Sequence, residues 1–173
     1  QKLEALNGNW IRQSDDADLL NYLEATGPEL EGEHHFATEL DAEKRGQVLA
    51  LMSGLKDRAK TAVELAEAAN FLFAQRPITL EPKAEKILTE GGREAVAAVL
   101  PTLEALDEWD IATIDAAVRA HVEATGTKLG KVAQPLRCAA TGSTTSPGVF
   151  DILAALGREE CLARLRDQAV LAK

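Results

Sequence analysis

Glycine and proline divide this chain of 173 residues into short segments, and in most segments the apolar residues recur at helical spacing. Pro82 and Pro147 stand where a proline fits the first turn of a helix, and Gly126 and Gly157 stand where a helix ends. Only 4% of the residues are aromatic, whereas Ala, Leu, Glu and Lys dominate, which favours helix over strand. The sequence therefore predicts an all-α fold, a compact multi-helix bundle or cage.

Helix boundaries follow from capping and breaking residues. Thr61 and Glu64 have the spacing of a capping box, and Asp110 is expected to cap a helix that ends at Gly126. Ser146 and Pro147 are expected as the N-cap and first-turn residues of a later helix. The other predicted helices are 15–24, 41–59, 61–73, 83–90, 93–106, 128–140, 148–156 and 158–172, with Pro101 and Pro135 inside two of them.

The dipeptide Arg76-Pro77 marks a break in the helical pattern. A chain of this length builds one domain with a real core or two small helical units. Apolar residues make up 46% and charged residues 27%, which is ordinary globular usage. We therefore expect two small helical subdomains, 1–76 and 77–173.

The net charge of the chain is −9, but the charges are unevenly distributed. Residues 128–173 contain seven Lys and Arg against four Asp and Glu, a net charge of +3, so the first 127 residues carry −12. Because phosphates attract cations, the overall charge argues against a polyanionic partner, whereas the basic end favours one. We therefore expect any nucleic-acid surface to lie near the C-terminus.

Residues that would carry catalysis or hold a metal are not found in the sequence. It contains no glycine-rich phosphate loop, no Gly-x-Ser-x-Gly and no His-Glu-x-x-His. His34 and His35 are adjacent and have no third ligand at a useful spacing, and His121 fits a helix at the edge of the core. Cys138 and Cys161 are isolated thiols, which fits a cytoplasmic protein, and no apolar run is long enough to cross a membrane. We predict no catalytic residue and no metal site.

A polar constellation near the C-terminus is the remaining candidate site. It comprises residues 134–137, the small polar loop 141–145 and residues 146–150. The N–H groups at a helix start can bind an anion or an exposed base edge. In the alternative reading Ser146 only caps its helix and Arg137 only pairs with an acid.

The same residues carry a resemblance to a known family. Residues 128–137 read KLGKVAQPLR, and ATG, SPGVF and LGRE follow at 140–142, 146–150 and 156–159. This run closely resembles the C-terminal signature of bacterial glutamyl-tRNA synthetases. The opening KLEALNGNW at 2–10 resembles the segment that follows their catalytic core. The chain begins at Gln1 rather than Met, and we expect it to be part of a longer protein.

The resemblance implies a class I aminoacyl-tRNA synthetase whose full-length form uses ATP, with magnesium, to charge tRNA with glutamate. The family's His-x-Gly-His and Lys-Met-Ser-Lys motifs do not occur in this sequence, so the chain is expected to lack the catalytic domain and to need no cofactor itself. It would comprise a stem-contact segment and the anticodon-binding region. The implied partners are tRNA-Glu, with tRNA-Gln as a second candidate, and the upstream catalytic domain of the same polypeptide, in a monomer.

The resemblance also implies site residues. The arginine of Gln-Pro-Leu-Arg and the Ser-Pro-Gly stretch contact anticodon bases in the family, and an upstream arginine helps some members to reject tRNA-Gln. This sequence departs from the family at Ser143, where many members have arginine, and at Cys138. Carried over, the anticodon-binding residues are Arg137, Ser146, Pro147, Gly148 and Val149, with Arg58 and Lys60 as candidates for the discriminating residue.

Two other interpretations stay open. The acidic first part is also typical of a helical module that binds another protein, which would bind RNA weakly and without salt dependence. Alternatively, the acidic part suppresses nonspecific RNA binding while the basic end docks.

Overall fold

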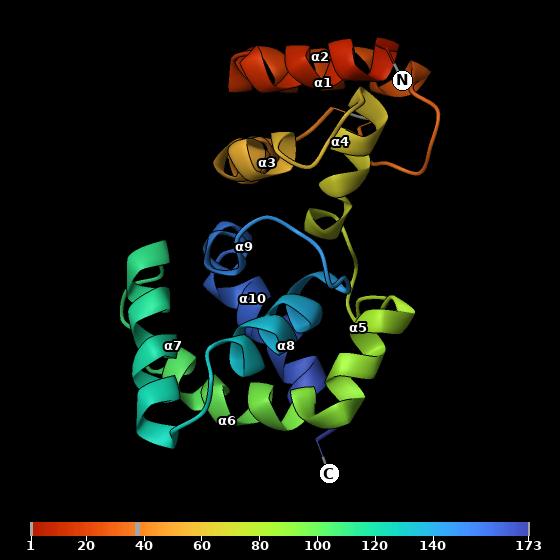
Figure 1. The fold of residues 1–173 in the computed structure, drawn as a ribbon. Coiled ribbons are helices and arrows are strands. Elements are labelled where there is room, and N and C mark those ends of the chain that lie inside the picture. The colour runs from red at the N-terminus through yellow and green to blue at the C-terminus, as the bar shows by residue number, and fades with distance from the viewer. Residues whose placement is uncertain (1, 37–38, 173) are drawn as a thin grey trace. The chain divides into compact units, whose positions relative to one another are not determined.

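The computed structural model describes residues 2–36 and 39–172, with side chains from residue 7 onward. Every regular element in these ranges is a helix, which confirms the all-α prediction. The chain forms two compact units, Gln1–Ala74 and Gln75–Lys173, each with its own core (Figure 1). None of the described helices is long and apolar enough to cross a bilayer.

Unit 1 is built around one central helix. Its elements are α1 (Lys2–Gln13), α2 (Asp16–Thr26), the 3-10 turn η1 (Gly27–Glu29), α3 (Ala42–Lys56), α4 (Ala62–Ala68) and the 3-10 turn η2 (Asn70–Leu72). Helix α3 packs against α1, α2 and α4. Helix α2, which packs against α3, buries Leu19, Leu20 and Leu23. The side chains that α3 buries there include Val48, Leu51, Met52 and Leu55.

Side-chain caps start α2, α3 and α4 where the sequence predicts. Asp15 accepts the N–H of Ala17 at 2.9 Å, and Thr61 Oγ1 accepts the N–H of Glu64 at 3.1 Å. The capping box is not fully reciprocal, because Glu64 Oε2 accepts the N–H of Lys60 rather than that of Thr61. The predicted helix 61–73 is too long, since α4 ends at Ala68 and a 3-10 turn follows.

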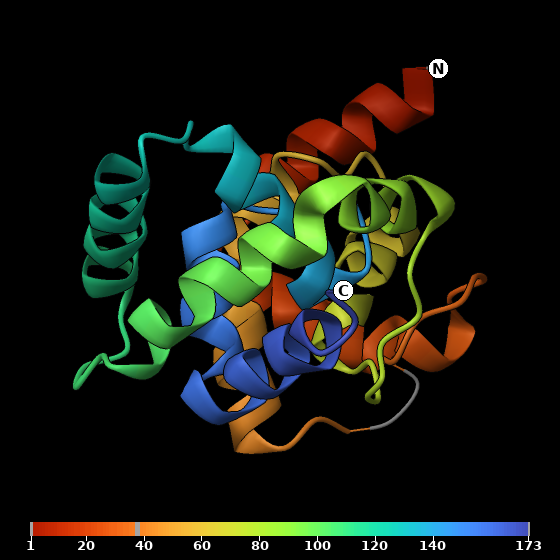
Figure 2. The same ribbon diagram turned by 90° about the horizontal axis from the view of Figure 1, so that it is seen from below.

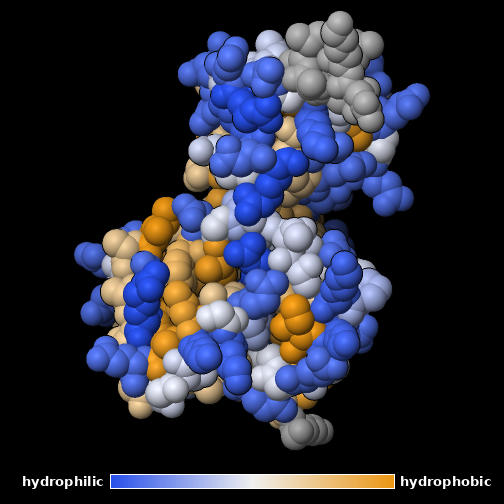
Figure 3. Space-filling model, in the orientation of Figure 1, coloured by the Kyte–Doolittle hydropathy of each residue, from blue (hydrophilic) through white to orange (hydrophobic). Residues whose placement is uncertain are grey.

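Several helices of unit 2 pack against its last helix. Its elements are α5 (Pro82–Ile87), η3 (Leu88–Gly92), α6 (Arg93–Glu104), α7 (Ile111–Thr125), α8 (Gly130–Thr141), α9 (Val149–Leu156) and α10 (Arg158–Ala169). Helix α10 packs against α6, α8 and α9, whereas α7 stands at the edge of the unit and contacts α6 and α9 (Figure 2). Hydrophobic residues gather beside α7 on the face in Figure 3, and α7 itself exposes Ile111.

A glycine separates α5 from α6. Gly91 has φ +100°, a left-handed conformation that glycine adopts without strain, and the N–H of Arg93 bonds the Leu88 carbonyl across the kink. This is the stop that the sequence predicts at Gly91-Gly92. The last helix, in contrast, ends at Ala169 rather than at the predicted residue 172.

Two arginines of α10 satisfy carbonyl groups at the ends of other helices. Arg158 donates from Nη2 to the Glu104 carbonyl at 2.7 Å and from Nη1 to that of Leu106, just past α6. Arg164 is 1% exposed, donates from Nη1 to the Ala140 carbonyl at 2.7 Å, and pairs with Glu160 at 2.7 Å. The last carbonyls of a helix have no partner within the helix. These guanidinium groups supply the missing hydrogen-bond donors at the ends of α6 and α8.

The buried arginine gives a stability prediction. Arg164→Ala should lower the free energy of unfolding by about 3 kcal/mol, because it leaves the Ala140 carbonyl buried without this donor. Arg166→Ala, on the same helix, removes only an exposed pair with Glu104 and should cost about 1 kcal/mol or less. Denaturant unfolding of both variants checks this, and equal losses would contradict it.

A second prediction concerns pH. The N–H of Thr113 donates to Asp110 at the start of α7 and holds the pKa of that carboxyl below its ordinary value of 3.8. The carboxylate therefore stabilises the fold above that pH, and the contribution is lost as the pH falls below it. Asp110→Asn keeps a cap without the charge, so its melting temperature should be lower than that of the wild type at pH 7. The two should converge as the pH falls below the lowered pKa of Asp110, where both forms of the cap are neutral.

Candidate nucleic-acid interface

Helix α8 ends in a tight turn that leads into the predicted site. Gly142 has φ +77°, and its N–H bonds the Cys138 carbonyl at 2.8 Å. A Cβ at this position would lie 2.2 Å from the carbonyl oxygen of Thr79. Only glycine therefore fits, for both conformation and space. The close approach is fixed by the N–H of Glu81, which donates to the Gly142 carbonyl at 2.8 Å.

Hydroxyl groups organise the loop after the turn. Thr141 Oγ1 lies 2.8 Å from the Arg137 carbonyl and accepts the N–H of Ser143 at 3.1 Å. Ser143 Oγ donates to Glu81 Oε2 at 2.9 Å and accepts the N–H of Thr145 at 3.2 Å. Two of these bonds hold the backbone N–H groups of Ser143 and Thr145, so the loop has a defined conformation although it is polar and small.

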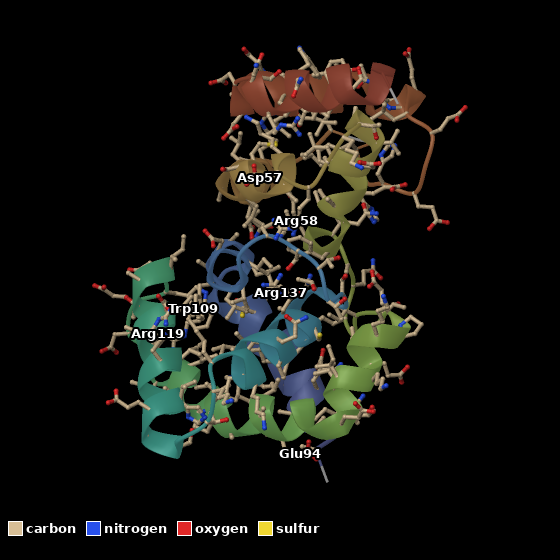
Figure 4. The ribbon with its side chains drawn as sticks, viewed as in Figure 1. Asp57, Arg58, Glu94, Trp109, Arg119 and Arg137 are labelled. Carbon is tan, nitrogen blue, oxygen red and sulfur yellow. The ribbon has the colours of Figure 1, made fainter. Side chains whose placement is uncertain are left out.

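Side chains of α8 also bond carbonyl groups of this segment. Gln134 donates from Nε2 to the Thr144 carbonyl at 3.0 Å, and Arg137 donates from Nη1 to the Ser146 carbonyl at 3.1 Å. Arg137 is half-buried and faces the loop (Figure 4). The structure therefore brings Arg137 and Ser146, two of the predicted site residues, into direct contact.

The start of α9 differs from the sequence prediction. Ser146 is 5% exposed and its hydroxyl donates to the Pro147 carbonyl at 3.2 Å, so the expectation that Ser146 caps the helix is wrong. The helix begins at Val149 and its N-cap is Gly148, which has no side-chain cap. Pro147 and Val149 are buried and Gly148 is exposed. At the start of α9 the exposed surface is therefore formed by the backbone at Gly148 rather than by the side chains of Ser146, Pro147 and Val149.

The two candidates for the discriminating residue lie in unit 1. Arg58 follows α3, is exposed, and donates from Nη1 to the Gly54 carbonyl at 3.2 Å. Lys60 is exposed and stands before the cap of α4. Both are therefore accessible to a ligand.

The excess of basic residues near the C-terminus does not form one open surface. Arg158 and Arg164 complete helix ends, and Arg166 pairs with Glu104 at 2.7 Å. Lys128 and Lys131 at the start of α8 are exposed. An RNA surface in unit 2 would therefore depend on few cations and on the backbone of the loop.

Groups that sequence analysis considered for chemistry have structural contacts. His34 Nε2 lies 3.1 Å from the Leu30 carbonyl, and His35 stacks on Phe73. Burial raises the pKa of the Cys138 thiol and raises that of Cys161 to about 12, so neither thiol is ionised at neutral pH. Among the described residues no three His, Cys, Asp or Glu side chains are grouped to hold a metal ion.

A cavity of about 580 Å³ lies elsewhere in unit 2. It is lined by η3, the end of α7 and the start of α8, and it includes His121 and Lys131. Gln134 lines this cavity and also bonds the Thr144 carbonyl, so it connects the cavity wall to the loop.

Two residues that brace the site were not found from the sequence. Glu81 contacts the loop from 62 positions away, and Trp109 donates from Nε1 to the Leu153 carbonyl of α9 at 2.8 Å (Figure 4). A local pattern does not reveal partners so distant in the chain. For Trp109 the one available signal was its rarity, since the chain has only two tryptophans. The indole N–H of a buried tryptophan usually has a hydrogen-bond partner.

Comparison with known proteins identifies the family of the chain. Residues 13–169 match the family model described as the anticodon binding domain. The chain is 56% identical, over 168 residues, to glutamate–tRNA ligase 1 of Brucella melitensis and to glutamate–tRNA ligase 2 of Brucella ovis. In both cases the alignment covers 97% of this chain and 36% of the ligase, so the chain spans about a third of the relatives' length.

Solved structures share the fold. A glutamate tRNA ligase from Elizabethkingia meningosepticum matches with a TM-score of 0.78 over 98% of this chain and 32% of that one, at 21% identity. The glutamate-tRNA synthetase of Elizabethkingia anophelis matches with a TM-score of 0.70 over 96% of this chain and 31% of that one, at 20% identity. Since the family model covers most of the sequence, the chain belongs to the family of anticodon-binding domains.

Proposed function

We propose that this chain reads the anticodon of tRNA-Glu as part of a glutamate–tRNA ligase. The observation that carries the proposal is the 56% identity to Brucella glutamate–tRNA ligases over 97% of the chain. The geometry of the loop after α8 supports it. This loop is small, polar and fixed, and it ends at a helix start without a side-chain cap.

The proposed recognition uses an arginine and backbone groups. Anticodon bases are unstacked, so their edges can accept and donate hydrogen bonds and their faces can stack on a guanidinium plane. Arg137 supplies the planar group, and Gly148 exposes the backbone at the start of α9. Ser146, Pro147 and Val149 are buried, so in this proposal they shape the backbone or offer their main-chain groups.

The remaining parts of the proposal concern the whole protein. ATP and magnesium act in an upstream catalytic half that charges the tRNA, and the protein is cytoplasmic and monomeric. Unit 1 contributes the stem contact and the first helical part of the anticodon-binding region, and the rest of that region follows from about residue 77. Acceptance of tRNA-Gln depends on a residue in unit 1.

Arg137 gives the most direct mutational test. Arg137→Ala should weaken binding of a glutamate anticodon stem-loop by about tenfold or more, because it removes a base contact rather than a general attraction. Arg119→Ala is the matched control, since Arg119 is an exposed arginine of α7 that pairs with Asp115. Titrations at two salt concentrations, with folding checked by melting, measure the effect.

Unchanged binding by a folded Arg137→Ala variant would rule out this role. Weak binding by the wild type, unaffected by salt, would instead favour a module that binds another protein.

The discriminating residue in unit 1 gives a second test. We propose Arg58 rather than Lys60, because a guanidinium group can bond a base edge with two parallel N–H groups and an ammonium cannot. Arg58→Ala should reduce the preference for tRNA-Glu over tRNA-Gln by about tenfold. Lys60→Ala should lower both affinities alike and keep the ratio. Competition binding with the two tRNAs measures this, and the reverse pattern would assign the role to Lys60.

A further inference from the structure

Glu81 has an unusual position for a carboxylate. It is the N-cap residue of α5, a position where a short polar side chain such as Asp or Ser accepts N–H groups of the first turn. Its side chain makes no capping bond, and the next residue is Pro82, which has no N–H. The carboxylate instead accepts the hydroxyl of Ser143 at 2.9 Å.

Through Ser143 this contact reaches the backbone of the loop. Ser143 Oγ also accepts the N–H of Thr145, one residue before Ser146. The main chain of Glu81 makes a second contact, since its N–H donates to the Gly142 carbonyl. Glu81 therefore fixes the start of residues 142–145 with its main chain and the Ser143 hydroxyl with its carboxylate. Gln134 and Arg137 of α8 bond the Thr144 and Ser146 carbonyls.

The negative charge of Glu81 is unfavourable for overall affinity toward RNA. It is exposed, and it places a negative charge beside a loop that would meet a polyanion, which weakens binding to any RNA. Its benefit must therefore lie in the conformation of the loop. A fixed conformation favours the base that fits, whereas a mobile loop adapts to several bases.

We propose that Glu81 is a positioning residue for anticodon reading: by accepting the Ser143 hydroxyl it fixes the loop that leads to Ser146 and Gly148. The proposal rests on the proposed function of the same loop. In this proposal the carboxylate of Glu81 has two separate effects. The hydrogen bond supports discrimination between anticodons, and the charge lowers affinity for every RNA alike.

The test compares three variants of the chain with two RNA stem-loops, one with the glutamate anticodon and one with a single anticodon base changed. Glu81→Ala should reduce the ratio of the two affinities by about fivefold, the worth of one net hydrogen bond. Glu81→Gln keeps an oxygen that accepts the Ser143 hydroxyl, so it should retain the ratio while both affinities rise. Glu85→Ala removes another exposed glutamate four residues on and should also retain the ratio.

Ser143→Ala provides an independent arm. It should lose at least as much discrimination as Glu81→Ala, because it also removes the bond from the Thr145 N–H. The double variant should be no worse than Ser143→Ala alone, because that change already breaks the bond to Glu81. Amide shifts of Thr145 and Ser146 in the free protein should move in Glu81→Ala and Ser143→Ala but not in Glu85→Ala.

Two outcomes would overturn the proposal. One is an unchanged ratio in a folded Glu81→Ala variant, and the other is an equal loss in Glu81→Gln, which would mean that the charge acts directly. If the wild type does not distinguish the two stem-loops at all, the proposed function fails, and that result is separate from either outcome.

Discussion

The C-terminal turn of α8 is the point on which both the core and the candidate site of unit 2 depend. On the inner side, the buried guanidinium of Arg164 bonds the Ala140 carbonyl and so joins α10 to the end of α8. On the outer side, Gly142 turns the chain against Thr79 and starts the polar loop. The bond from α10 and the start of the loop lie on the same turn. The packing of α10 therefore sets the position from which the loop reaches Ser146.

The charged residues of unit 2 serve either the packing of helices or the proposed binding of RNA. The basic excess near the C-terminus suggests an RNA surface, yet Arg158 and Arg164 complete helix ends and Arg166 pairs with Glu104. A guanidinium group suits that purpose because it offers several donors in one plane. The proposed RNA contacts are then Arg137, which also bonds the Ser146 carbonyl, the exposed Lys128 and Lys131, and the loop backbone, in a chain whose first 127 residues are strongly acidic. Such a surface favours readout of bases over attraction to phosphates.

Much of the fold could be predicted because helix starts are local. Asp110 bonds an N–H three residues on, so residue type and spacing suffice to place the cap. The same rule failed at Ser146, whose hydroxyl turns to the neighbouring carbonyl, so that α9 begins later. In the site, Arg137 and Ser146 are nine residues apart and lie in one recognisable run. The contact of Glu81 with the loop joins distant segments, and no sequence pattern indicates it.

The central claim, that the loop after α8 and the start of α9 read an anticodon, is tested most directly by mapping where RNA binds. The isotope-labelled chain would be titrated with a glutamate anticodon stem-loop and with one whose anticodon is changed, while backbone amide shifts are followed at several salt concentrations. We expect shifts concentrated in residues 142–150, larger for the matching anticodon and retained at higher salt. A folded protein whose shifts lie elsewhere, or are the same for both RNAs, would contradict it.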